Sequence, residues 1–156
     1  MSGVLTAKNL NKRYGKQLAV DHVNLDIQPG RIIGLIGPNG SGKTTTLKAA
    51  LGLVPFDGEL KVLGFDPRTQ RDELMNNVCF IADVAVLPRW IKVSEALDFV
   101  ESTHPKFSRT KAMAYLAKTK LKPDMKVKQM SKGMIVQLHL AIVMSIDAKL
   151  LVLDEP

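Results

Sequence analysis

The chain has a single cysteine and few aromatic residues. Cys79 cannot form an internal disulfide, and its apolar surroundings in NVCFIAD indicate a buried, unreactive thiol. A chain without disulfides suits a reducing compartment, so we expect the protein in the cytoplasm. Aromatic residues make up 5% of the 156 positions, and no aromatic pair interleaves the lysines as a stacking surface for nucleic-acid bases would require.

The sequence also lacks a long apolar run. No stretch approaches the roughly eighteen residues that a membrane-spanning helix needs, and the N-terminus MSGVLTAKNLNKRYGK becomes charged too early for a secretory signal. With 46% hydrophobic and 24% charged residues, the composition is that of a soluble α/β protein with a core rather than of a disordered chain.

Acidic residues are in the minority. Lysine and arginine outnumber aspartate and glutamate by 22 to 15, which gives a formal net charge of +7. The basic residues gather between Lys106 and Lys132. Such a patch is compatible with nucleic acid or an anionic membrane surface, but a solvated helical face has the same composition. We favour the solvated face and expect no nucleic-acid partner.

The apolar residues that are present follow two periods. Short continuous or alternating runs predict strands at 19–30, 31–37, 56–67, 75–83 and 149–156. Helical spacing predicts helices at 43–52, 92–120 and 131–146. The run at 31–37 is continuously apolar, as a strand buried on both faces would be. This order of elements belongs to the α/β class, in which ligands bind at the C-terminal ends of parallel strands.

A glycine-rich loop lies between the expected strand at 31–37 and the expected helix at 43–52. Gly37 to Thr44 fits the pattern G-x-x-x-x-G-K-[ST] in full. Glycines let the loop curl so that several backbone N–H groups converge on one anion. The following helix adds unpaired N–H groups, and Lys43 adds a full positive charge. The loop therefore predicts a triphosphate site in which Thr44 gives its hydroxyl to Mg²⁺.

Two carboxylates follow the last apolar strand, in LLVLDEP. Asp154 matches the Walker B aspartate that holds magnesium, and Glu155 is placed to orient or deprotonate an attacking water. Without other motifs, an Asp-Glu pair after an apolar strand more often only marks the end of the strand. With the glycine loop upstream, the functional interpretation is the better one.

These motifs resemble those of the nucleotide-binding domain of an ABC ATPase. GPNGSGKTT at 37–45 is similar to that family's Walker A motif, and LLVLDEP to its Walker B motif. MSKGM at 130–134 occupies the place of the family's signature, and Tyr14 fits the aromatic position that stacks on adenine. The resemblance covers essentially the whole chain.

The resemblance implies the fold of a P-loop NTPase. We expect a RecA-like, mainly parallel sheet core (31–54, 76–84 and 147–156), an antiparallel β part (1–30 and 55–65) and an inserted helical subdomain with the signature (85–146). Together they would make one nucleotide-binding domain over 1–156. Because the family continues past its Walker B strand, we expect a truncated domain that hydrolyses ATP poorly alone and exposes apolar surface.

The family's functional residues carry over position by position. Nucleotide-binding positions are Tyr14, Gly37, Pro38, Asn39, Gly40, Ser41, Gly42, Lys43, Thr44 and Thr45. Catalytic positions are Glu155 and Lys43, and metal positions are Thr44, Asp154 and Asp83. The signature residues Ser131, Lys132 and Gly133 would contact the nucleotide of a second subunit. A surface turn residue is the alternative for Tyr14, and a plain helix cap the alternative for Ser131.

The implied function is an ATPase subunit that binds ATP and Mg²⁺, pairs with a like domain as a homo- or heterodimer, and drives transmembrane permease subunits from the inner face of the cell membrane. Similar SKGM wording in export-type members favours export. The alternatives are a soluble ABC ATPase acting on ribosomes or DNA, and a nonhydrolysing ATP-binding module. The departures from the family pattern are Asp83 in place of a glutamine, and Lys132 and Met134 in place of a glycine and a glutamine of the signature.

Overall fold

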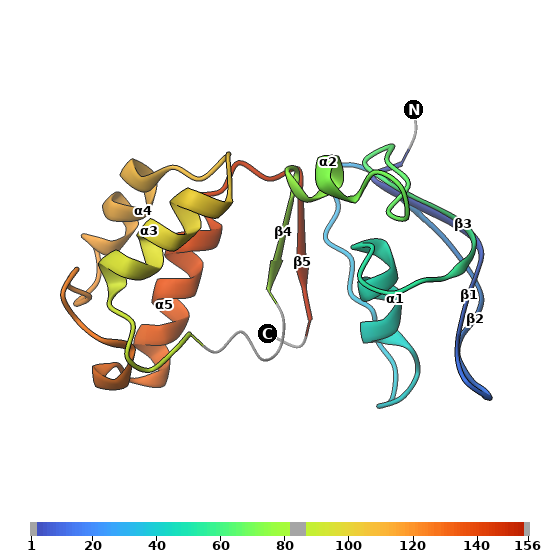
Figure 1. The fold of residues 1–156 in the computed structure, drawn as a ribbon, viewed down its shortest axis with the longest axis horizontal. Coiled ribbons are helices and arrows are strands. Elements are labelled where there is room, and N and C mark those ends of the chain that lie inside the picture. Colours follow the sequence, from blue (N-terminus) through green and yellow to red (C-terminus); the bar gives the residue numbers. More distant parts are fainter. Residues whose placement is uncertain (1–2, 82–86, 155–156) are drawn as a thin grey trace. The chain divides into compact units, whose positions relative to one another are not determined.

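The computed structural model describes residues 3–81 and 87–154. These fall into two units: the first holds the described residues up to Phe80 together with Lys149–Asp154, and the second holds those from Ile81 to Ala148. The first unit contains the sheets and the glycine loop, and the second is helical (Figure 1).

An antiparallel sheet forms the N-terminal part of the first unit. Its strands, in the order β2-β1-β3, are β1 (Leu5–Tyr14), β2 (Gln17–Ile27) and β3 (Asp57–Val62). Alternate residues of β1 point into the core, as expected for a sheet with one covered face. Helix α1 (Lys43–Ala50) packs against β2 and β3. The core between them includes Leu10, Val20, Ala49, Leu51 and Leu60.

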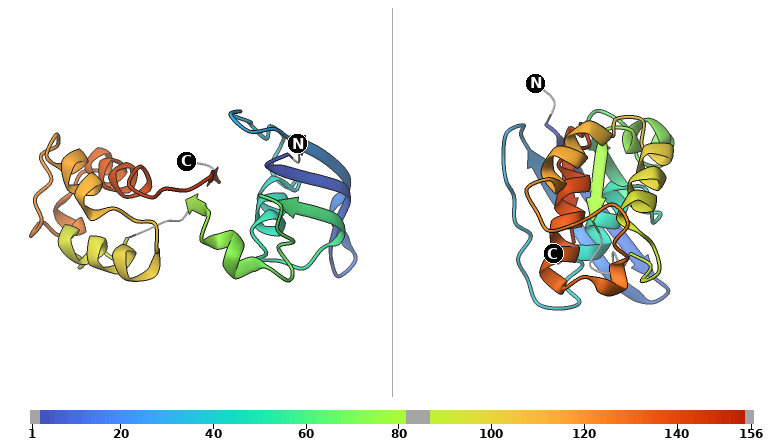
Figure 2. Two further views of the ribbon diagram at one scale, coloured as in Figure 1. Left: turned by 90° about the horizontal axis from the view of Figure 1, so that it is seen from above. Right: turned by 90° about the vertical axis from the view of Figure 1, so that its left-hand side faces the viewer.

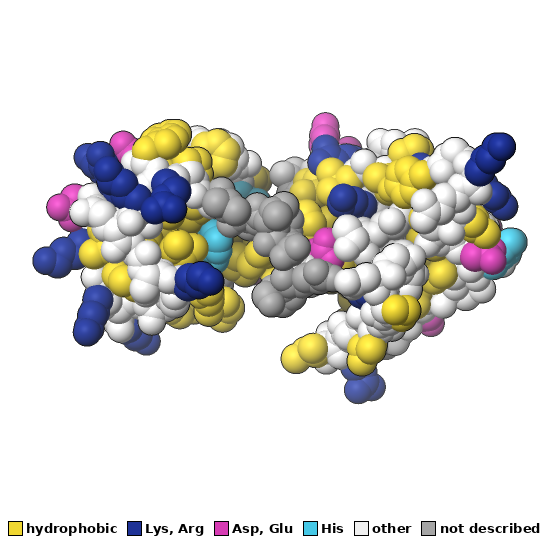
Figure 3. All heavy atoms as spheres, turned by 90° about the horizontal axis from the view of Figure 1, so that it is seen from below, with side chains coloured by type: hydrophobic (Ala, Val, Ile, Leu, Met, Phe, Trp, Pro, Cys, Tyr) yellow, Lys and Arg dark blue, Asp and Glu magenta, His cyan; other side chains and the backbone are white. Residues whose placement is uncertain are grey.

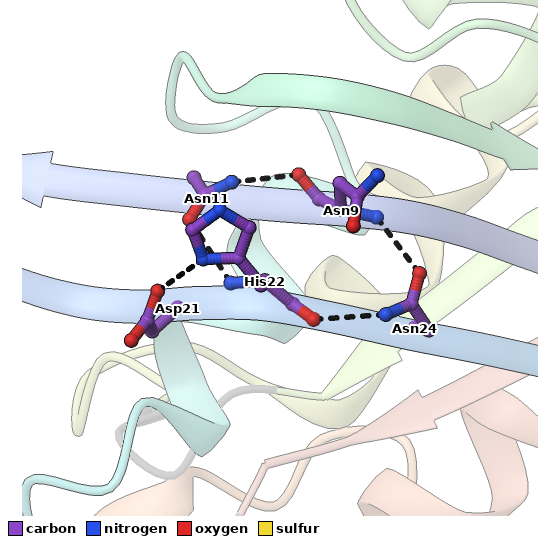
Figure 4. Close-up of polar contacts among 5 residues, drawn as sticks. All are labelled: Asn9, Asn11, Asp21, His22 and Asn24. Atoms are coloured by element: carbon purple, nitrogen blue, oxygen red, sulfur yellow. Dashed lines mark hydrogen bonds and ion pairs between the residues drawn. The ribbon is translucent and has the colours of Figure 1, made fainter.

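The β1–β2 hairpin contains an irregular pair of residues. Asn9 and His22 both have left-handed backbones, with φ of 49° and 46°. The side chain of Asn11 accepts from His22 N at 2.9 Å and donates to Asn9 O at 2.8 Å. Asn24 accepts from Asn9 N at 2.9 Å and donates to His22 O at 3.0 Å (Figure 4). Two carboxamides thus replace the backbone pairing that the irregularity interrupts.

A second, two-stranded sheet completes the first unit. β4 (Val78–Ile81) pairs with β5 (Leu150–Leu153), and the two run in the same direction (Figure 1). The short helix α2 (Arg71–Met75) precedes β4. The strands expected within 75–83 and 149–156 are therefore confirmed. Val78 and Val152 join the core of the antiparallel sheet, and Cys79 is buried as expected.

The prediction of a strand at 31–37 is wrong. Residues 31–38 have no regular secondary structure, and the segment belongs to neither of the two described sheets. Ile32 and Ile36 are fully exposed, at 103% and 99%. Apolar composition alone does not make a strand, because a strand also needs a neighbour to pair its N–H and C=O groups. The first unit therefore exposes apolar surface beside the glycine loop.

Three helices pack together in the second unit (Figure 2). They are α3 (Val93–Thr103), α4 (Arg109–Leu116) and α5 (Lys132–Val143), with a single 3₁₀ turn, η1 (Val127–Gln129), before α5. Their shared core includes Val93, Leu97, Ala112, Leu116 and Leu138. Among the helices in the described part of the chain, none is long and apolar enough to cross a bilayer.

The single helix expected over 92–120 is two helices. The chain leaves helical geometry at His104, whose φ and ψ are −120° and 110°, directly before Pro105. A proline disfavours helical geometry at the preceding residue, so the break has a local cause. Ser108 then caps α4 by accepting a hydrogen bond from Lys111 N at 3.4 Å.

Most lysines between 106 and 132 are exposed, and basic side chains dot the surface of the helical unit (Figure 3). Among the basic residues of this stretch, Arg109 has acidic partners, Asp98 at 2.5 Å and Glu101 at 3.0 Å. The distribution fits the solvated helical face that the composition favoured.

Candidate functional site

The glycine loop ends in a helix that has no side-chain cap. The backbone of the loop turns back on itself, and Ser41 N donates to Pro38 O at 3.2 Å. Gly40 and Gly42 have φ of 82° and 89°. Gly42 is the N-cap of α1 but has no side chain to accept from the first turn. The N–H groups of that turn are therefore left for an acceptor outside the helix, and the positive end of the helix dipole lies with them.

Gly42 also lies in close contact with the antiparallel sheet. A Cβ at this position would come within 2.2 Å of the carbonyl oxygen of Ala19 in β2. Only glycine fits this contact, and only glycine adopts the positive φ without strain. The contact places the loop against the end of β2 that leads to Tyr14.

Lys43 is held by the loop itself. Its ammonium donates to Gly37 O at 2.7 Å and to Pro38 O at 3.0 Å. These carbonyls keep the charge at the mouth of the loop, beside the uncapped start of α1. A phosphate oxygen arriving there would meet an ammonium and several backbone N–H donors together.

Thr44 and Asp154 come together although they are 110 residues apart in the sequence. The Thr44 hydroxyl donates to Asp154 Oδ1 at 2.9 Å, and Asp154 is 8% exposed at the end of β5. A hydroxyl and a carboxylate oxygen are ligands that Mg²⁺ accepts. These two residues fit a magnesium ion bound beside the phosphate loop.

Tyr14 lies at the end of β1 and is 47% exposed. It pairs with Gln17 across the hairpin, two residues before Ala19, whose carbonyl approaches Gly42. Two residues of strand span about 7 Å, so the strand end that carries Tyr14 lies near the loop. Lys12 lies beside Tyr14 and was not predicted as a site residue. Its ammonium lies 4.8 Å from the centre of the Tyr14 ring.

The signature residues lie in the second unit, at the start of α5. Ser131 is the N-cap of α5 and accepts from Met134 N at 3.2 Å. Its contact with a nucleotide stays a prediction. Ser131, Lys132 and Gly133 are all exposed. Ser131 and Gly133 line an open groove of about 650 Å³ that Lys118 and Lys120 also line.

Two of the expected site residues, Asp83 and Glu155, lie outside the described residues. His139 of α5 received no functional role from the sequence, and it is half-buried; burial lowers the pKa of its imidazole. Burial likewise raises the pKa of the Cys79 thiol, which keeps it protonated and unreactive at neutral pH.

The glycine loop, the uncapped helix α1 and Asp154 at the end of β5 together define a P-loop nucleotide-binding domain of the α/β class. The ABC transporter family matches residues 20–156, so the chain belongs to that family. The Nod factor export ATP-binding protein I of Cupriavidus metallidurans is 33% identical over 171 residues, which cover the whole of this chain and 54% of that protein.

Solved structures agree with this assignment. An ABC transporter ATP-binding protein from Pyrococcus furiosus is 26% identical, with a TM-score of 0.80 over 97% of this chain and 75% of that one. The cbiO1 protein of Clostridium perfringens, part of the ABC transporter complex cbiONQ, has a TM-score of 0.79 over 100% of this chain and 66% of that one. At 21% identity, the second likeness shows the fold alone. The chain spans about half the length of the curated relatives it matches.

Proposed function

We propose that this chain binds and hydrolyses ATP as the nucleotide-binding subunit of an ABC transporter. The observation that carries the proposal is the hydrogen bond of 2.9 Å between Thr44 and Asp154, at the uncapped start of α1. It joins the two motifs that a Mg²⁺–nucleotide complex needs, the loop for the phosphates and the acidic strand end for the metal.

Each part of the loop has a role in this proposal. Backbone N–H groups from Gly42 to Thr45 surround the phosphates, with Gly37, Pro38, Asn39, Gly40 and Ser41 shaping the curve of the loop before them. Lys43 exchanges its loop carbonyls for phosphate oxygens, a charge-assisted bond that is stronger than a neutral one. Thr44 and Asp154 hold Mg²⁺, which when bound neutralises charge on the phosphates. Tyr14 stacks on the adenine.

The remaining residues act on water and across a dimer. Glu155, directly after the metal-binding aspartate, orients or deprotonates the attacking water. Asp83 adds a further oxygen near the metal. Ser131, Lys132 and Gly133 contact the nucleotide bound to a second nucleotide-binding domain, because the exposed start of α5 offers a hydroxyl, N–H groups and a lysine to an anion.

In this proposal the chain binds a transmembrane permease from the cytoplasmic side of the cell membrane. The direction of transport is export. The similarity to the Nod factor export ATP-binding protein I of Cupriavidus metallidurans supports the direction. The SKGM wording of the signature supports it independently. The basic surface of the helical unit has no role as a nucleic-acid site.

The test compares ATP hydrolysis by the wild-type chain and by Glu155→Gln, with Mg²⁺–ATP binding measured in parallel. Removing a general base lowers turnover by about a hundredfold or more. We expect a slow wild-type rate that falls by this factor in Glu155→Gln, while affinity for ATP stays within about twofold. Equal rates for the two proteins would favour the nonhydrolysing alternative and contradict the proposed enzyme.

A further inference from the structure

A lysine occupies a core position of β1. The buried residues of this strand are Leu5, Ala7, Leu10 and then Lys12, which is only 9% exposed. In the hairpin register Lys12 lies opposite Val20, itself 3% exposed. A lysine is rarely buried to this degree unless its stem packs on apolar neighbours and its ammonium has a partner.

The partner of that ammonium is an aromatic ring. Lys12 Nζ lies over the Tyr14 ring, 4.8 Å from its centre, and among the described residues this is the only hydrogen-bonding, ionic or ring contact of the Lys12 side chain. The distance is within the range of a cation–π contact. No carboxylate of the described residues forms an ion pair with Lys12, so its largely buried stem holds the ammonium against the ring.

Tyr14 itself is otherwise loosely held. It ends β1 beside the turn at Gly15, and nearly half of it remains exposed. An exposed ring at a strand end would rotate among several rotamers and would lose that freedom on binding a ligand. A cation fixed against the ring already restricts its rotamers in the free protein, so less conformational freedom is lost when a ligand binds.

We propose that Lys12 is a positioning residue for nucleotide recognition, which pins the Tyr14 ring so that a nucleobase stacks on it. The inference rests on the proposed function, because it assigns the ring to the base of the nucleotide whose phosphates the glycine loop binds. Lys12 acts through Tyr14 and does not contact the phosphates.

The experiment compares two ligands on the same proteins. Lys12→Met and Lys12→Gln keep an unbranched stem but remove the charge, whereas Lys12→Arg keeps a cation. Binding is titrated with Mg²⁺–ATP and, separately, with Mg²⁺ and inorganic tripolyphosphate, which has no base. We expect both neutral variants to bind ATP about threefold to fivefold more weakly, with tripolyphosphate affinity unchanged and with Lys12→Arg close to wild type.

A double-mutant comparison isolates the ring. In a Tyr14→Ala background, we expect Lys12→Met to have no further effect on ATP affinity, because the group through which it acts is absent. Equal losses for ATP and tripolyphosphate would overturn the inference, since they would place the lysine at the phosphates or in general folding. Unchanged ATP affinity in both neutral variants would also overturn it. If instead the wild-type chain bound neither ligand, the proposed function itself would fail.

Discussion

Replacing Gly42 by alanine is expected to destabilise the first unit by about 2–5 kcal/mol and to abolish nucleotide binding. A left-handed backbone costs a residue with a Cβ roughly 1–2 kcal/mol, and forcing a methyl group into a filled space costs about 1–3 kcal/mol. Both costs apply here, because φ is 89° and the new Cβ would lie 2.2 Å from Ala19 O. Backbone cannot move aside as a flexible side chain can, so either the loop or β2 must shift.

Gly40→Ala is the matched control. Gly40 has a similar φ of 82°, but apart from its chain neighbours no atom of the described residues lies within 4 Å of the position that its Cβ would take. We expect it to cost only the conformational part, about 1–2 kcal/mol. Chemical denaturation of the two variants separates the cost of the positive φ from the cost of the steric overlap with Ala19 O. Equal midpoints for Gly40→Ala and Gly42→Ala would contradict the close packing of the loop on β2.

The second large effect concerns magnesium. Replacing Asp154 by asparagine removes the negative charge but keeps the size of the side chain and one acceptor for the Thr44 hydroxyl. Without metal, we expect ATP to bind at least as well as to wild type, because one repulsive charge near the phosphates has gone. With Mg²⁺, we expect affinity roughly tenfold or more below wild type, because a metal ligand has been lost.

The measurement is ATP affinity with Mg²⁺ and with a chelator, for Asp154→Asn and for Thr44→Val, which removes the hydroxyl at nearly constant volume. Asp66→Asn is the control, because Asp66 is an acid of the same unit whose carboxylate pairs with Arg68 at 2.8 Å. That variant should keep the wild-type response to magnesium. An undiminished magnesium response in Asp154→Asn would remove the Thr44–Asp154 pair from the metal site.

The parts of the site that the sequence could predict are those set by local chemistry. The glycine loop runs directly into its helix, and the apolar strand before Asp154 has its own pattern. Gly52 ends this helix, because its φ of 66° directly after Leu51 is the left-handed geometry that glycine adopts at helix ends. The break before Pro105 also has a local signal, which is the proline itself.

Two features depend on pairing that the sequence does not encode locally. The apolar run at 31–37 predicted burial, but its isoleucines are exposed because neither described sheet pairs with it. Lys12 was overlooked because its position becomes inward-facing only after the irregularity at Asn9 and His22 shifts the register of β1 against β2. A one-residue shift moves side chains to the other face, so core positions beyond it could not be assigned from spacing alone.

The central claim is that the glycine loop binds the phosphates of a nucleotide with the help of Lys43. Its most direct test is a titration of the chain with Mg²⁺–ATP, compared with Lys43→Ala and with Lys48→Ala, a control at an exposed position in the last turn of the same helix. We expect saturable binding that falls roughly tenfold to a hundredfold in Lys43→Ala and is unchanged in Lys48→Ala. An absence of saturable binding in the wild type, or equal affinity in wild type and Lys43→Ala, would contradict the account.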